Sequence, residues 1–193
     1  MLTRIEIDGF KTFDGFSLDL NPFLVIVGPN ATGKSNLFDA FQLLSHLASD
    51  DLRTAFSGLR GDPDELFRMG PDSTPTDTIS LACEVLLNPL VQDPWGRIET
   101  VKFTRIRYEV EIQRKSDDRG IERLVVTRES ALPILSANDR WRPHGARPCP
   151  EFRKAYMKYG RTSPFLSTQE ENGAPTFHIH QDARAGRKRS ALA

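Results

Sequence analysis

The feature that most constrains this chain is an apolar run, residues 23–27, which ends at a glycine-bounded loop. The loop residues are Gly28, Pro29, Asn30, Ala31, Thr32, Gly33, Lys34 and Ser35, and they satisfy the pattern G-x-x-x-x-G-K-[ST]. The run lacks polar alternation, which predicts a strand buried on both faces. Apolar residues recur at helical spacing from 37 to 48, which predicts a buried helix. The sequence therefore predicts a strand, a tight loop and a helix in direct succession.

The spacing of this loop suits a chain of phosphates. Glycines at 28 and 33 allow the backbone to wrap tightly, so that several N–H groups converge on one anion. The first amides of the helix have no internal partner, and the helix dipole favours an anion there. Lys34 would reach the β and γ phosphates as the catalytic cation, and Ser35 would offer its hydroxyl to Mg²⁺. The loop, extended to Asn36, is thus predicted to bind ATP and Mg²⁺.

Two flanking segments carry a family resemblance. The strings "GFKTF" at 9–13 and "GPNATGKSNLFDAF" at 28–41 resemble the N-terminal half of ATPase heads in the SMC, RecF and RecN-like branch of the ABC ATPases. Both strings are also similar to those of small relatives of these heads, the AAA-family or OLD-like ATPases. The resemblance is specific for residues 1–48, weaker in "LRGDPDELFRMG" at 59–70, and thin after residue 130.

The resemblance implies roles for residues outside the loop. Lys11 and Thr12 would contact the base, ribose or γ-phosphate, although a charged turn between core phenylalanines is an open alternative. Arg60 would approach the nucleotide, and Gln169 would contact magnesium. Ala31 stands where such loops often carry glycine, so the loop is expected to adopt a conformation that alanine tolerates.

Hydrolysis requires carboxylates that the resemblance places on a strand of four apolar residues ending in Asp-Glu. The nearest string, "RLVVTRE" at 123–129, ends in Thr-Arg-Glu, and an LSGGQ-like signature is absent from the sequence. The chain is therefore expected to be the first lobe of a head, with the second lobe following in a longer protein or coming from another polypeptide. The chain alone is expected to hydrolyse ATP near background. A complete assembly would pair two heads around ATP, as DNA-repair and phage-defence members of the family do.

Two other functions stay open on the sequence. One is a P-loop kinase or other phosphotransferase, against which the lack of an acceptor-binding motif counts. The other is a regulatory or interaction subunit that binds nucleotide without hydrolysing it.

The predicted fold is α/β: a P-loop core with an adjoining antiparallel β meander, forming one lobe of an ABC/SMC-like head. Residues 1–130 form the ATP-binding lobe with the meander, and residues 131–193 form an irregular extension with a basic end at 184–189. A shift in apolar alternation predicts a bulge or a twist near Thr104 and Arg105. Strands are predicted at 2–8, 16–20, 78–87, 101–113, 121–127 and 176–180, and helices at 37–48, 65–67 and 151–159.

Charge and composition restrict the partners. The net charge of zero combines 6 Lys/Arg and 14 Asp/Glu in residues 1–96, a charge of −8, with 20 and 12 in residues 97–193, a charge of +8. Such a split indicates either a nucleic-acid surface, with DNA as a possible partner, or complementary halves of a fold or homo-oligomer. No signal peptide and no run of about 18 apolar residues occurs, so a cytoplasmic protein without membrane contact is expected.

Three residue pairs have weaker signals. His178 and His180 share a strand face but have no third ligand, so packing is favoured over a metal site. Glu109 and Glu111 stand beside arginines, which favours a solvated charge ladder over catalysis. Cys83 and Cys149 lack CxxC spacing, so neither zinc nor a disulfide framework is expected.

Overall fold

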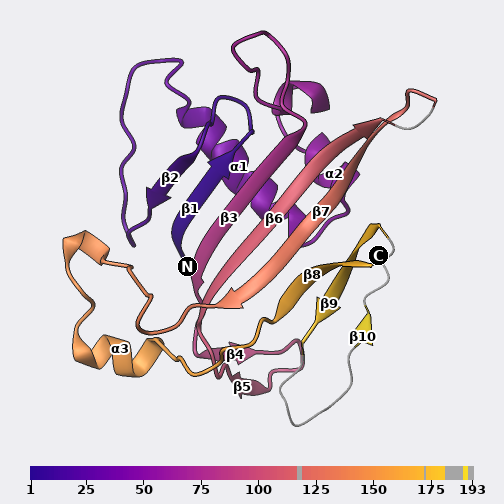
Figure 1. The fold of residues 1–193 in the computed structure, drawn as a ribbon. Helices are drawn as coiled ribbons and strands as arrows, with labels where there is room; N and C mark the ends of the chain where they lie inside the picture. Colours follow the sequence, from indigo (N-terminus) through magenta and orange to yellow (C-terminus); the bar gives the residue numbers. More distant parts are fainter. Residues whose placement is uncertain (117–118, 172, 181–188, 191–193) are drawn as a thin grey trace.

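A computed structural model describes residues 1–116, 119–171, 173–180 and 189–190. Its main element is an eight-stranded antiparallel sheet in the order β10-β9-β8-β7-β6-β3-β1-β2, with α1 and α2 on one face (Figure 1). The strands of this sheet are β1 (Leu2–Asp8), β2 (Phe16–Asp19), β3 (Thr78–Leu86), β6 (Arg105–Ser116), β7 (Glu122–Pro133), β8 (Leu166–Glu171), β9 (Ala174–Ile179) and β10 (Arg189–Ser190). The remaining elements are β4 (Leu90–Gln92), β5 (Ile98–Thr100), α1 (Lys34–Leu47), α2 (Leu52–Ser57), α3 (Pro150–Tyr156), and the 3₁₀ turns η1 (Pro63–Leu66) and η2 (Pro143–Gly145).

The core lies between this sheet and the two helices. In β1 the side chains of Ile5 and Ile7 point inward, and they are paired in register with Cys83 and Leu81 of β3. Strand β6 continues the same inner face with buried valine and isoleucine. Helix α1 covers this face with Leu37, Ala40 and Leu43, and α2 adds Phe56. The alternate apolar residues of the strands and the apolar residues at helical spacing in α1 thus pack against each other in one core.

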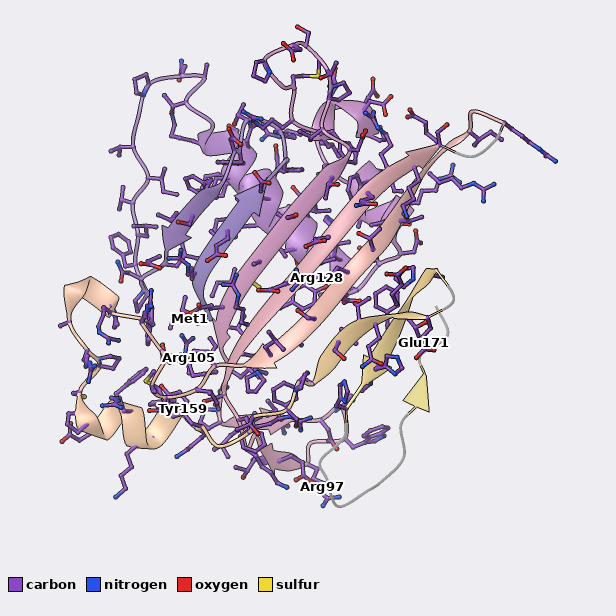
Figure 2. All side chains as sticks on the ribbon, in the orientation of Figure 1. Met1, Arg97, Arg105, Arg128, Tyr159 and Glu171 are labelled. Atoms are coloured by element: carbon purple, nitrogen blue, oxygen red, sulfur yellow. The ribbon has the colours of Figure 1, made fainter. Side chains whose placement is uncertain are left out.

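The opposite face of the sheet is a ladder of charged pairs. Arg107 bonds Glu6 of β1 and Glu109 of its own strand, at 2.5 and 2.6 Å. Arg128 of β7, on the open face in Figure 2, reaches both Glu109 and Glu111. The prediction that Glu109 and Glu111 belong to a charge ladder is confirmed.

The prediction of a buried strand at 23–27 is wrong. These residues form no strand, and Phe23 and Val27 are 77% and 83% exposed; Ile26 alone of the five packs against the core. A strand needs a hydrogen-bonded neighbour, and β1 already pairs with β2 on one side and β3 on the other. Among the described residues none pairs with 23–27. An apolar segment of strand-like composition therefore lies exposed directly before the glycine loop.

Helix α1 is also less buried than predicted. Phe38 is exposed, and Phe41 and Leu44 are only partly buried against the core. The side of α1 that faces away from the sheet has no covering layer in the described structure.

The meander is confirmed, with changes in detail. Strands β3, β6 and β7 pair in antiparallel fashion, but β6 begins at Arg105 and the register shift lies between Glu111 and Ile112. The predicted bulge near Thr104 and Arg105 is wrong, because β6 begins at Arg105 and pairs with β3 there without a register shift, so positions 101 and 103 lie before the strand. The residue pattern also missed α2, β8 and the β4–β5 hairpin, all of which are short.

The extension is partly strand and partly irregular. The expected boundary at residue 130 falls inside β7, and the β8–β9 hairpin joins the main sheet where Ala131 pairs with Leu166. Helix α3 agrees with the helix predicted at 151–159. Residues 184–188 of the basic end lie outside the described residues. Within the described ranges, no helix has the length and apolar character needed to cross a bilayer.

Candidate nucleotide site

The glycine loop ends in an uncapped helix start. Gly33 is the N-cap of α1 with φ 85° and ψ 3°, and no side chain caps the helix. The amides of the first turn have no carbonyl partner within the helix. They are therefore available, with the positive end of the helix dipole, to a negatively charged group.

Backbone conformation explains two loop positions and corrects a third. Gly33 has a left-handed φ, and an added Cβ would lie 3.2 Å from Thr12 Oγ1. At Gly28 an added Cβ would lie 3.1 Å from Thr32 Oγ1. Ala31 has φ 66°, so the expectation of a conformation that alanine tolerates is wrong. A left-handed residue with a Cβ costs about 1–2 kcal/mol.

Lys34 folds back onto the loop. Its Nζ donates to the carbonyl oxygens of Gly28 and Pro29, the first at 2.7 Å, and lies 3.3 Å from Thr32 Oγ1. The ammonium group is thus held against the loop whose amides are the candidate anion binders.

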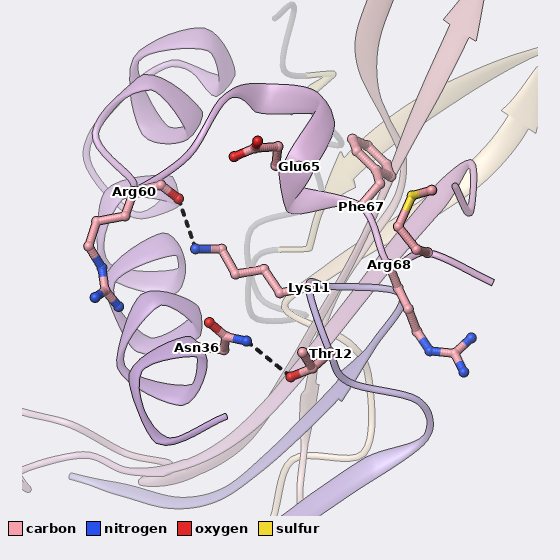
Figure 3. A pocket seen from close by; sticks show the side chains of 8 residues that line it. Lys11, Thr12, Asn36, Arg60, Glu65, Phe67 and Arg68 are labelled. Atoms are coloured by element: carbon pink, nitrogen blue, oxygen red, sulfur yellow. Dashed lines mark hydrogen bonds between the residues drawn. The ribbon is translucent and has the colours of Figure 1, made fainter. Parts of the chain in front are cut away.

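A second group of polar residues lies beside the loop. A cavity of about 590 Å³ is lined by Lys11, Thr12, Asn36, Arg60, Glu65, Phe67, Arg68 and Met69 (Figure 3). Asn36 Nδ2 donates to Thr12 Oγ1 at 3.1 Å, and this bond joins α1 to the turn after β1. The turn is fixed by backbone bonds from Lys11 N to Leu66 O and from Arg68 N to Gly9 O, both 2.8 Å. The structure therefore brings Lys11, Thr12 and Arg60 together with Asn36, and the nucleotide contacts that the resemblance implies for them stay a prediction.

An aspartate in α1 joins these cations, and the sequence reasoning missed it. Asp39 Oδ2 accepts from Lys11 Nζ at 2.6 Å, and Arg60 donates to both oxygens of Asp39 at 2.8–3.1 Å. Burial raises the pKa of Asp39, but the hydrogen bonds and charges of Lys11 and Arg60 outweigh burial and hold that pKa below its ordinary value. The available signal was a carboxylate inside an apolar helical stripe, four residues after Ser35.

The two predicted magnesium ligands are not brought together. Ser35 stands exposed at the start of α1, and its carbonyl accepts from Arg60 Nη2 at 3.0 Å. Gln169 lies on β8, across the sheet from the start of α1 (Figure 1), in another cavity with Glu111 and Arg128. Of the two, only Ser35 adjoins the loop.

The remaining candidate pairs form no site in the described residues. His178 lies 3.3 Å from Glu171, and His180 Nε2 lies 2.7 Å from Ser167 Oγ. The described part of the chain holds no group of three or more His, Cys, Asp or Glu that could bind a metal. Cys83 is buried with its pKa raised to about 11 by burial, and Cys149 is exposed, so both thiols are free.

Comparisons with known proteins agree with the sequence resemblance. Residues 1–131 match the family model of the AAA ATPase domain. The DNA replication and repair protein RecF of Aliivibrio fischeri is 35% identical over 77 residues, which cover 38% of this chain and 21% of that protein. The chromosome partition protein Smc of Methanocaldococcus jannaschii is 46% identical over 61 residues, or 30% of this chain and 5% of that protein.

One more curated relative and one solved structure were also found. The structural maintenance of chromosomes protein 1 of Schizosaccharomyces pombe is 38% identical over 55 residues, or 28% of this chain and 4% of that protein. A solved structure from a study of ATP-driven dimerization and DNA-stimulated activation of SMC ATPases is 19% identical, with a TM-score of 0.41 and coverage of 65% of this chain and 68% of that chain. The matched segments thus span about a fifth of the RecF protein and 5% or less of the two chromosome proteins.

Proposed function

The chain belongs to the AAA ATPase domain family, and from that membership we propose that it holds the triphosphate of Mg²⁺-ATP in the loop from Gly28 to Ser35. The observation that carries the proposal is the left-handed, uncapped Gly33 at the start of α1. That geometry leaves first-turn amides for the phosphates, and no side chain competes for them.

The loop residues divide the work of binding. Lys34, already folded against the loop, would give its ammonium group to the phosphate oxygens. The exposed hydroxyl of Ser35 would ligate the magnesium ion, which when bound neutralises charge on the β and γ phosphates. The cavity beside Thr12 and Asn36 would receive the γ-phosphate end of the triphosphate, with Lys11 and Arg60 adding positive charge.

We further propose that this chain acts as one lobe of an SMC- and RecF-like head. The apolar run at 23–27 and Phe38 expose hydrophobic surface to solvent, which is typical of an interaction site. A second ATPase lobe, whose strands would pair with 23–27, would bury them and would supply the carboxylates for hydrolysis. Pairing of two such heads around ATP, and DNA as the partner of the assembly, belong to the same proposal.

The binding proposal is tested by calorimetric titration of the purified chain with Mg²⁺-ATP and Mg²⁺-GTP. We expect saturable ATP binding, weakened about 10–100-fold by Lys34→Ala, because one charge-assisted phosphate contact is lost. Lys154→Ala, which removes an exposed lysine of α3, is the matched control and should bind like the wild type. A folded wild-type chain with no affinity for either triphosphate overturns the proposal.

The lobe proposal is tested by phosphate release and by light scattering with and without Mg²⁺-ATP. We expect turnover near background for this chain alone. Brisk turnover would show that the chain carries its own catalytic carboxylate, and transfer of phosphate to an acceptor would show a phosphotransferase. Val25→Lys, at an exposed site, should leave ATP binding intact but prevent capture of a second lobe.

A further inference from the structure

We infer that Asp39 is a positioning residue that holds Lys11 and Arg60 beside the first turn of α1, where they meet the γ-phosphate end of the nucleotide. The inference rests on the proposed function of the Gly28–Ser35 loop. It assigns a role to a helix residue that lies outside the loop itself.

The burial of Asp39 calls for such a role. Its side chain is 3% exposed, on the buried face of α1 beside Leu37, Ala40 and Leu43. A charge in that position loses its hydration and is retained only when strong partners compensate. Asp39 has two of them, because Lys11 donates to Oδ2 and Arg60 donates to both oxygens.

Arg60 is held by one edge of its guanidinium group. Nε and Nη2 donate to Asp39, and Nη2 also donates to the carbonyl of Ser35, the candidate magnesium ligand. Nη1 has no hydrogen-bond partner in the part of the chain that the structure describes, and the side chain is 64% exposed. Asp39 thus fixes the direction of Arg60 and leaves a donor edge for a phosphate oxygen.

Lys11 is held in a different way. Its side chain is 12% exposed, and Nζ donates to Asp39 at 2.6 Å and to the carbonyl of Arg60 at 2.8 Å. An ammonium group has three donors, so one remains for a ligand. In Figure 3 Lys11 extends across the cavity toward Arg60. The two cations and one carboxylate carry a net charge of +1, so the cluster still attracts an anion.

The direction in which one substitution changes nucleotide affinity distinguishes a positioning role from a simple electrostatic effect. Asp39→Asn removes a negative charge beside a site for a polyanion, so Coulomb attraction alone predicts tighter binding of every nucleotide. Positioning predicts weaker binding, concentrated on the triphosphate, because both cations lose their anchor. A general loss of structure would weaken ATP and ADP alike.

The experiment measures the affinities of Mg²⁺-ATP and Mg²⁺-ADP for the wild type and for Asp39→Asn, with thermal unfolding to confirm folding. We expect ATP to bind about tenfold more weakly and ADP less than about twofold more weakly. Asp72→Asn removes the charge of an exposed carboxylate that does not line this cavity, and it should bind ATP as tightly as the wild type. Equal or tighter ATP binding by Asp39→Asn, or equal losses for ATP and ADP, would overturn the inference.

A second variant keeps the inference testable if Asp39→Asn fails to fold. Arg60→Gln changes an exposed side chain and should reduce the preference for ATP over ADP to a similar extent. An unchanged preference in Arg60→Gln would overturn the inference whether or not Asp39→Asn folds. Where Asp39→Asn folds, we combine it with Arg60→Gln in a double variant. Compared with Arg60→Gln alone, this double variant should lose only the additional preference for ATP that Lys11 contributes. Lys11→Met measures that contribution. Full additivity of Asp39→Asn and Arg60→Gln would show that Asp39 does not act through Arg60. Failure of the wild type to bind ATP would instead overturn the proposed function.

Discussion

The indole Nε1 of Trp141 donates a hydrogen bond to the backbone carbonyl of Leu20 at 2.9 Å, across 121 residues of sequence. Beside it, the backbone N–H of His144 donates to the side-chain Oδ1 of Asn21 at 2.9 Å. Leu20 and Asn21 stand where β2 has ended and the exposed segment toward the glycine loop begins. Trp141 lies beyond residue 131, the end of the family match. The extension therefore anchors the start of the segment that carries the candidate site.

Replacing Trp141 with phenylalanine tests this anchor. Trp141→Phe keeps an aromatic ring against Phe152 but leaves the carbonyl of Leu20 without its donor. We expect a loss of about 1–3 kcal/mol in the free energy of unfolding. Hydrogen exchange at the amides of Leu20 and His144, which are bonded to Thr3 O and Asn21 Oδ1, should become faster. Trp95→Phe, at an exposed hairpin tip, is the control, and equal exchange rates in the two variants would contradict the prediction.

Strain at Ala31 predicts that glycine is better tolerated there than at a helical position. Ala31→Gly relieves a left-handed φ worth about 1–2 kcal/mol, against about 0.4–1 kcal/mol from the freer unfolded chain. We expect unchanged or higher stability in urea unfolding, with ATP affinity retained. Ala40→Gly, in the buried middle of α1, should lose about 1 kcal/mol or more. The prediction is wrong if the two substitutions destabilise equally.

The buried pair of Arg105 and Asp139 predicts a reversal between single and double substitutions. Arg105 donates to Asp139 at 2.6 and 2.9 Å, with Tyr159 also bound to that carboxylate; Figure 2 places Arg105 and Tyr159 close together. Asp139→Asn leaves a guanidinium group of 0% exposure with only Glu84, at 3.3 Å, as a counter-charge, which costs up to about 3–5 kcal/mol. The double change Arg105→Met with Asp139→Leu should cost less than Asp139→Asn, as measured by denaturant unfolding. A double variant that loses at least as much would contradict this.

The charge ladder predicts a pH dependence of stability. The hydrogen bond from Arg107 is the main cause that lowers the pKa of Glu6 from 4.5 to about 2. A carboxylate with a lowered folded-state pKa stabilises the fold above its unfolded value, and this stabilisation is lost as the pH falls through the folded value. The free energy of unfolding of the wild type should therefore exceed that of Glu6→Gln by about 1 kcal/mol near pH 7, given partial solvent screening. This difference should vanish as the pH falls from about 4.5 to 2.

Thermal unfolding of both proteins across that pH range checks this prediction. Glu99→Gln is the control, since its partner Arg97 is exposed on the β4–β5 hairpin. Parallel stability curves for wild type and Glu6→Gln would refute the assignment.

Several elements could be predicted because their signals are local. Strand β1 and helix α1 follow from the spacing of apolar residues within one segment, and both occur at the expected positions. The loop follows from glycines and a lysine that are neighbours in sequence. The run at 23–27 failed for the opposite reason, because an apolar composition states a preference for a strand but does not supply the partner.

Contacts between residues distant in sequence could be predicted only in part. Lys11, Thr12 and Arg60 were correctly grouped near the loop through the family resemblance, and the cavity beside Asn36 unites them. Gln169 was placed by resemblance alone, and it lies on a strand that joins the far part of the sheet. The residues around Gln169 do not indicate which strands its own strand pairs with, so its position in the sheet could not be predicted.

The sequence by itself determined the strand periods of the meander, the helix α1 and the residues of the glycine loop, since each depends on side chains within a few positions of one another. Only the tertiary structure decided which charges meet. Lys11 reaches Asp39 across 28 residues and Arg105 reaches Asp139 across 34. Such pairs form because the sheet and α1 fold their backbones together, and a buried carboxylate then remains charged only where that folding delivers a cation.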